Sequence, residues 1–258
     1  MFNLFRQREL LDKDTVEWLF DVFAWGLRNF DRRVFFDETI LVIPSNKHFP
    51  GRVNSVEGMA GLIFEQVKTY AGMKHWPCKL VDQTRISEPV QAVKVLIDGD
   101  IRGAGGIEPE AVADEHKLLI AYNPHQINNP EAMIASYAHT LAHYLGSMAQ
   151  EPPPGGEELW PHTTEILAVF MGFGAMFANS ASVFRGGCGR CHNPLAERTA
   201  FLSQDEITYA LALFCVLKDI PNKEVLPHLK KHLRPIFKKA VKQLRQENTA
   251  LDKLRAVK

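Results

Sequence analysis

The longest near-apolar stretch of this chain runs from Ile166 to Ala178, and it limits the folds that are open to the sequence. A helix that crosses a bilayer needs roughly 20 apolar residues, so this stretch is too short to span a membrane. A helix that is apolar on all sides is buried in a core instead. The stretch therefore predicts a central buried helix, and a chain of 258 residues is long enough to surround it.

Segments with strand character come first along the chain, and helical segments follow. Short β-branched runs predict strands over residues 39–43, 92–97 and 117–122. Apolar residues at helical spacing predict helices over residues 14–27, 55–72, 130–147, 162–180, 204–218 and 223–246. This order is typical of an α+β fold. We expect an N-terminal part with a small mixed sheet over residues 1–128 and a helical part over residues 129–258, which could also form one continuous domain.

Charge is balanced overall but not along the chain. Thirty basic residues match thirty acidic ones. From Lys223 to Lys258, however, eleven Lys and Arg residues stand against three acidic ones. The helix expected there is amphipathic, with one apolar stripe and one basic face. Because no nucleic-acid-binding motif accompanies it, the sequence favours docking onto the acidic surface of a protein partner over binding of DNA, RNA or a membrane, with a merely solvated face as the alternative.

The N-terminal residues lack the apolar region and cleavage site of a secretion signal, so a cytoplasmic protein is expected. Four cysteines do not make a disulfide framework at this length. The segment Cys188-Gly-Arg-Cys191-His192 has the spacing of a covalent haem site, but haem attachment would require export. Ordinary thiols in a loop are the favoured interpretation of this segment. A metal or redox role is the alternative, and covalent haem comes third.

The segment Ala138-His139-Thr140-Leu141-Ala142-His143 holds two histidines on one face of a predicted helix. This is the geometry by which a helix offers two imidazoles to one zinc ion. In zinc peptidases that carry His-Glu-x-x-His, the glutamate activates the metal-bound water. Here Thr140 stands at that position, and its hydroxyl is no general base near neutral pH. Two histidines bonded to neighbouring groups at the edge of the core are the alternative interpretation.

A wider pattern resembles the zincin metallopeptidases. A strand, the histidine helix, a loop and a second helix that begins with Thr163-Thr-Glu165 and continues as an apolar run resemble the gluzincin-type core. The pattern is similar, more narrowly, to uncharacterised bacterial proteins that carry His-Glu-x-x-His and then Thr-Asp. The stretch from Trp18 to Pro50 and the segment Phe201-Leu-Ser203 also resemble that group.

The resemblance implies two alternatives for the third zinc ligand. In gluzincins the second helix supplies a ligand glutamate and, one turn later, an aspartate. In that register the ligand position falls on Pro161 and the aspartate position on Glu165, so the ligand is lost. In another register Glu165 coordinates zinc together with His139 and His143, with His162 as a helper. Glu165 could also be an ordinary acid in the first turn of a helix.

These residues lead to two functional hypotheses. The favoured one is a degenerate zincin-like protein, a pseudo-metallopeptidase with a binding or regulatory role. The alternative is an active zinc-dependent hydrolase or peptidase with an atypical base, for example Glu151, Glu157 or Glu158 from the Pro/Gly-rich loop. Zinc is the one cofactor that the pattern suggests, and no catalytic residue is assigned.

Overall fold

The computed structural model describes residues 9–85, 97–107, 112–185 and 200–257. Its α-helices are α1 Lys13–Asn29, α2 Val56–Tyr70, α3 Pro130–Ser147, α4 Trp160–Ala168, α5 Gly174–Arg185, α6 Gln204–Leu217, α7 Asn222–Val225, α8 Leu233–Leu244 and α9 Asn248–Arg255. Its strands are β1 Cys78–Asp82 and β2 Leu118–Tyr122, and two π-helical turns are η1 Val34–Glu38 and η6 Val169–Phe173. Single 3-10 turns occupy Gln83–Arg85, Asp114–His116, Pro124–Asn128, Glu157–Leu159 and Leu226–His228.

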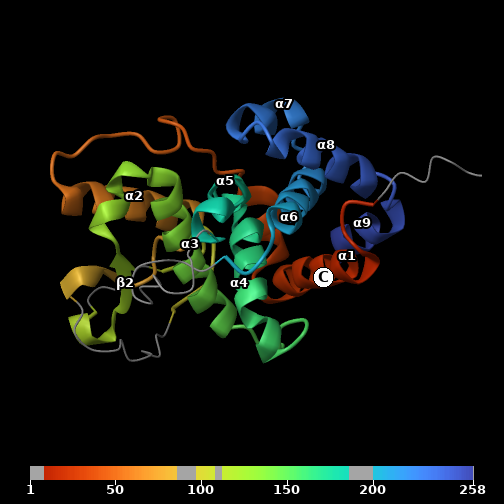
Figure 1. The fold of residues 1–258 in the computed structure, drawn as a ribbon. Coiled ribbons are helices and arrows are strands. Elements are labelled where there is room, and N and C mark those ends of the chain that lie inside the picture. The colour runs from red at the N-terminus through yellow and green to blue at the C-terminus, as the bar shows by residue number, and fades with distance from the viewer. Residues whose placement is uncertain (1–8, 86–96, 108–111, 186–199, 258) are drawn as a thin grey trace, which may run out of the picture.

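The fold is α+β, as expected, with helices in large excess (Figure 1). Strand β2 confirms the strand predicted over residues 117–122. It pairs in parallel with β1, which the sequence reasoning missed, in a register that places Cys78 opposite Leu118 and Asp82 opposite Tyr122. An isolated antiparallel bridge joins Gly99 and Gly106. Most of the strand predicted over residues 92–97 lies outside the described residues.

The strand predicted over residues 39–43 is wrong, because this extended segment pairs with a helix break and not with a strand. The backbone N–H of Val42 donates to the carbonyl of Gly172 at 3.0 Å. Gly172 has a φ of +99°, and a Cβ at this position would lie 2.1 Å from the carbonyl oxygen of Ile40. Only glycine combines this backbone conformation with so close an approach. The segment is therefore bound to the centre of the molecule.

The apolar stretch at 166–178 forms the centre of the core, as predicted, but as α4, η6 and α5 and not as one regular helix. Its residues are almost entirely buried. Phe170 stacks on Phe35 from η1 with ring centroids 4.5 Å apart, and Phe214 from α6 meets the same Phe35 ring edge-on at 5.6 Å. Segments far apart in sequence thus share one core, which extends from Leu19 to Leu254.

Within the described residues, one helical stretch, Glu157–Ala181, passes the length and hydropathy test for a membrane span. Its apolar window is completely covered by other parts of the fold. The stretch therefore packs as the core helix of this structure.

The continuous helix predicted over residues 223–246 is divided. Helix α7 ends at Val225, and α8 begins only at Leu233. Pro227 has no N–H for a helical hydrogen bond, and Leu229 adopts an extended conformation with ψ of 141°. Helix α8 then packs its apolar face along α6, and α9 packs against α1, so the first and the last described helices lie side by side (Figure 1).

Several helices begin with a side-chain cap that is visible in the sequence. The Ser55 hydroxyl accepts from the N–H of Gly58, and Ser203 with Glu206 forms the predicted capping box. The first helix starts earlier than predicted, because the Asp12 carboxylate accepts from the N–H of Thr15. Ser203 matters for the site below, since the same turn also contacts α4.

Candidate functional site

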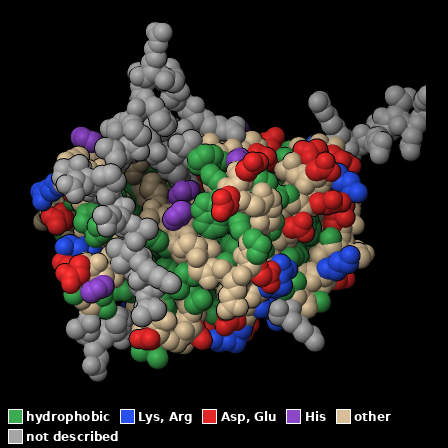
Figure 2. Space-filling model, turned by 90° about the horizontal axis from the view of Figure 1, so that it is seen from below, with side chains coloured by type: hydrophobic (Ala, Val, Ile, Leu, Met, Phe, Trp, Pro, Cys, Tyr) green, Lys and Arg blue, Asp and Glu red, His purple; other side chains and the backbone are tan. Residues whose placement is uncertain are grey.

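Helix α3 carries both histidines, and His143 contacts the start of α4. The first turn of α3 is fixed by the Asn129 side chain, which accepts from the N–H of Ala132 at 3.3 Å, and by Pro130. The Tyr144 hydroxyl donates to the Leu119 carbonyl in β2 at 3.4 Å. His139 is half-buried and His143 is exposed. Figure 2 shows histidine side chains side by side at the edge of a hollow on one face of the molecule.

Trp160, the first residue of α4, lies directly against this part of α3. Its indole N–H donates to Nδ1 of His143 at 3.2 Å, and the two rings meet edge-on with centroids 5.7 Å apart. Gly146 makes this approach possible, because a Cβ there would lie 2.5 Å from the Trp160 ring. Trp160, Gly146 and His143 therefore form one packed unit.

This contact fixes the protonation pattern of His143. An indole N–H only donates, so Nδ1 of His143 must be the nitrogen that accepts. The neutral imidazole then carries its proton on Nε2. The rings packed against one side of the imidazole partly desolvate it, and this lowers the pKa of His143 below its ordinary value of 6.5 although part of the ring is exposed. With Nδ1 occupied and Nε2 protonated, the ring has no lone pair available for a metal ion in this arrangement.

A zinc-binding histidine normally has the opposite surroundings. It coordinates through one nitrogen, and its other N–H donates to a carboxylate, a backbone carbonyl or water. Beside His143 stands a donor, the indole N–H of Trp160, whereas a zinc-binding histidine would have an acceptor there. The arrangement is thus suited to packing of α4 on α3.

Thr140, at the position of the usual glutamate, is turned towards its own helix. Its hydroxyl donates to the carbonyl of Ser136 at 3.1 Å, one turn earlier. The group at the position of the base therefore makes a local backbone contact.

Glu165 lies in the second turn of α4 with 1% of its surface exposed. One of its carboxylate oxygens accepts from the N–H of Leu202 at 3.0 Å, immediately before the capping box of α6. This bond joins the start of α4 to the start of α6. Because Glu165 lies beyond the first turn, an interaction with the helix dipole is not its main role.

His162, the proposed helper, lies one turn before Glu165 and packs on the exposed ring of Phe201 with centroids 5.6 Å apart. Its Nδ1 is buried without a hydrogen-bond partner among the described residues. His162 and Glu165 therefore both contact the segment that comes directly before α6.

The loop acids that could replace the missing base have other surroundings. Glu151 forms an ion pair with Arg28 of α1 at 2.8 Å, and the guanidinium lowers the pKa of that carboxyl. The indole N–H groups of Trp18 and Trp25 donate to the Pro154 and Glu151 carbonyls and hold the loop on α1. Glu157 and Glu158 are exposed.

Across the described ranges, no three His, Cys, Asp or Glu side chains gather as a group that could hold a metal ion. The zinc set of His139, His143 and Glu165 stays a prediction. Of these, His143 and Glu165 each make a specific contact that joins α4 to a neighbouring helix. Cys188, Cys191 and His192 lie outside the described residues, and so does any site built on them.

No family model, curated protein or solved structure matches this chain. The resemblance to zincins therefore rests on the sequence pattern and stays a prediction. What the site can do must be argued from its own contacts.

A second candidate region is the outer face of α8 and the turn before it. Its cations are Lys231, Arg234, Lys238, Lys239 and Arg245, most of them exposed. Within the described part of the chain, none of these five forms an ion pair with a carboxylate. The opposite face is buried through Leu233, Phe237 and Leu244. The amphipathic character predicted from the sequence is thus confirmed for α8.

Sequence reasoning missed Trp160 as a site residue. The signal was present, because Trp160-Pro161 follows a Pro/Gly-rich loop and Gly146 lies one turn after His143. A small residue on a helix face allows close approach of a large ring from a neighbouring helix.

Proposed function

We propose that this chain is a non-catalytic, zincin-like protein that acts by binding a partner. The observation that carries the proposal is the hydrogen bond from the Trp160 indole to Nδ1 of His143. This bond occupies Nδ1 of an imidazole that a zinc site would need. It also places an N–H donor beside His143, whereas a zinc-binding histidine has a hydrogen-bond acceptor beside it. Thr140 supports the same conclusion, because it supplies no base.

The partner surface in this proposal is the basic outer face of α8. Cations without carboxylate neighbours attract an acidic surface, and their contribution weakens as salt screens it. We propose an acidic protein as the partner, since α8 presents no exposed aromatic side chains of the kind that stack on nucleic-acid bases.

Catalysis is tested by protein hydrolysis in the presence of zinc. We expect the wild type to leave an unfolded protein substrate intact. We also expect Thr140→Glu to be inactive, because the added base finds His143 still bonded to Trp160. Hydrolysis by the wild type that is lost in His143→Ala would overturn the proposal in favour of the alternative, a working zinc hydrolase.

Binding is tested with poly-glutamate as a model acidic surface and a DNA duplex as the competing class. We expect poly-glutamate to bind in a salt-dependent manner and Lys231→Glu/Lys238→Glu to weaken it about tenfold. Lys13→Glu on α1, also an exposed lysine, is the matched control. Equal weakening by both variants, or tighter binding of the duplex, would contradict an acidic protein partner.

A further inference from the structure

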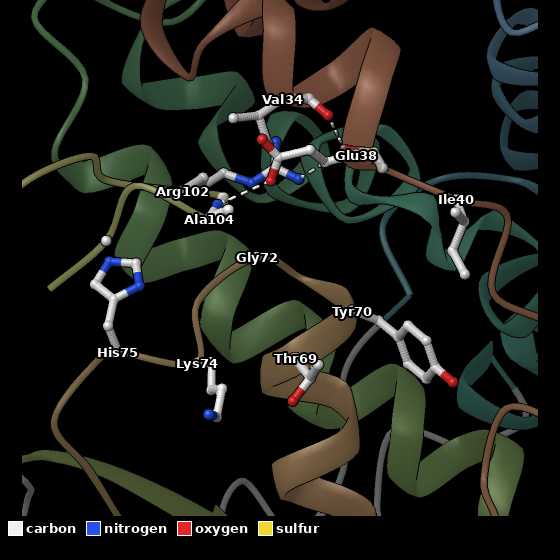
Figure 3. Close-up of a pocket in the computed structure, with 13 residues that line it drawn as sticks. Val34, Glu38, Ile40, Thr69, Tyr70, Gly72, Lys74, His75, Arg102 and Ala104 are labelled. Atoms are coloured by element: carbon white, nitrogen blue, oxygen red, sulfur yellow. Dashed lines mark hydrogen bonds between the residues drawn. The ribbon is translucent and has the colours of Figure 1, made fainter. Parts of the chain in front are cut away.

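A pocket of about 530 Å³ is lined by residues outside the histidine helix. We call it the Arg102 pocket. It lies between η1, the end of α2 and the loop at 102–106 (Figure 3). Chemistry-bearing side chains in its wall include Glu38, Lys74, His75 and Arg102. In Figure 3 the Lys74 and His75 side chains lie below the cavity, and Arg102 and Glu38 lie above it.

The wall of the pocket is a fixed structure. Gly72 and Gly103 both have a positive φ, of +73° and +92°, and the N–H of Gly103 donates to the carbonyl of Gly72 at 2.8 Å. A Cβ at Gly103 would lie 2.6 Å from the Val34 side chain and 2.8 Å from a carboxylate oxygen of Glu38. Glycine is therefore required for η1 and the loop to meet this closely.

Arg102 is a buried cation held by neutral groups. Its side chain is 1% exposed. Its Nε donates to the Ala71 carbonyl at 2.9 Å, and its Nη2 donates to the Thr39 hydroxyl at 3.2 Å. Its Nη1 is buried without an acceptor among the described residues. Burial lowers the pKa of Arg102 to about 10, so the guanidinium stays charged at neutral pH.

The carboxylates of Glu38 and Asp31 favour the charged form of Arg102 from a distance, but neither pairs with it directly. Glu38 accepts from Arg33 Nη1 at 3.1 Å and from the backbone N–H of Ala104 at 2.8 Å. In the described part of the chain, no carboxylate lies within 4.0 Å of an Arg102 nitrogen. A buried guanidinium without a counterion is costly, and a buried donor without an acceptor is rare in native proteins. A ligand that brings a negative charge would explain both the unpaired guanidinium and the missing acceptor for Nη1.

We propose that the Arg102 pocket binds a small oxyanion, a carboxylate or a phosphate, that pairs with the Arg102 guanidinium. Lys74 at the pocket wall adds attraction for the same charge, whereas Glu38 repels it. The anionic group therefore enters along the side of Lys74 and His75. Because Nη1 is closed to water in the empty pocket, the ligand draws the guanidinium from the Thr39 hydroxyl towards the cavity. Bidentate pairing with an oxyanion suits the planar fork of arginine.

The experiment is calorimetric titration of the full chain with inorganic phosphate and, separately, with succinate. Butylamine serves as a cationic probe of comparable size. Binding of phosphate or of succinate, without binding of butylamine, supports the proposal, and the tighter of the two anions identifies the ligand chemistry. The absence of heat from both anions up to about 10 mM would overturn it.

Three variants locate the binding. Arg102→Gln should weaken the anion at least about tenfold. Thr69→Trp fills the pocket from an exposed position of α2 without touching Arg102, and it should weaken the anion to the same degree. Lys79→Ala, an exposed lysine in β1 outside the pocket, is the control and should leave affinity unchanged. If Arg102→Gln fails to fold, Thr69→Trp becomes the deciding variant. Unchanged affinity of Thr69→Trp for the anion would overturn the proposal.

Discussion

The indole of Trp160 donates its N–H to Nδ1 of His143 across 3.2 Å, and this bond joins helices α3 and α4. It connects the first residue of α4 with the fourth turn of α3. Because the same imidazole cannot accept from an indole and serve as a metal ligand in its neutral form, the contact makes the helix pair a packing unit.

Removal of the indole N–H should raise the pKa of His143. In Trp160→Phe the ring loses a donor that stabilises its neutral form, and part of its burial is lost. We expect the pKa to move up towards 6.5, measured by NMR titration of the histidine ring protons. Trp18→Phe, which removes an indole N–H bonded to the Pro154 carbonyl, is the control and should leave His143 unchanged.

The lowered pKa of His143 also has a consequence for stability. Between the folded pKa and 6.5, the unfolded chain binds a proton at this site that the folded chain does not. Proton binding at His143 in the unfolded chain therefore destabilises the fold as the pH falls through 6.5. This effect is absent at pH 8. Denaturant unfolding at pH 8 and pH 5.5 should show a smaller loss of stability in Trp160→Phe than in the wild type. An equal loss in both proteins would contradict this assignment.

Gly172→Ala should be among the most destabilising single substitutions in the chain. The new Cβ would have to occupy the space of the Ile40 carbonyl oxygen, at a φ of +99°. We expect a loss of about 3 kcal/mol or more in denaturant unfolding. Gly61→Ala in α2 is the control, because its Cβ meets nothing within 4 Å. It should stabilise the protein by about 0.5–1 kcal/mol.

Glu165 tests the structural interpretation of the second helix. Glu165→Gln keeps an oxygen that can accept from the N–H of Leu202, so its stability should change by less than about 1 kcal/mol. Glu165→Leu leaves that buried N–H without its acceptor and should cost about 1–3 kcal/mol. The measurement is urea unfolding of both variants. Equal stability of the two variants would show that the carboxylate does not hold the start of α6.

Two cysteines should resist alkylation in the native protein. Burial raises the pKa of Cys78 to about 12 and raises the pKa of Cys215 as well, so neither holds appreciable thiolate at pH 8. Mass spectrometry after iodoacetamide treatment should find both unmodified until denaturant is added. Modification of Cys215 under native conditions would indicate local opening of α6.

The sequence predicted those elements whose determinants are local. The capping box of Ser203 and Glu206 and the apolar stretch around Phe170 are both readable from neighbouring residues. The strand predicted at 39–43 failed because its hydrogen-bond partner is Gly172, more than a hundred residues away. β-branched residues show that a segment is extended and buried, but they do not show what it pairs with.

Several residues of the candidate site could be predicted from the sequence, but their contacts could not. Spacing placed His139 and His143 on one helix face, and composition suggested a basic face on α8. The partners of these groups are set by tertiary packing: Trp160 for His143, and Leu202 for Glu165. Arg102 carried no local signal, since a single arginine in a glycine-rich loop is ordinary until its burial is known.

Zinc titration of the wild-type protein shows whether helices α3 and α4 form a zinc centre. We expect no stoichiometric zinc at micromolar concentrations, with the same result for His143→Ala. One equivalent of zinc bound tightly by the wild type and lost in His143→Ala would contradict this expectation.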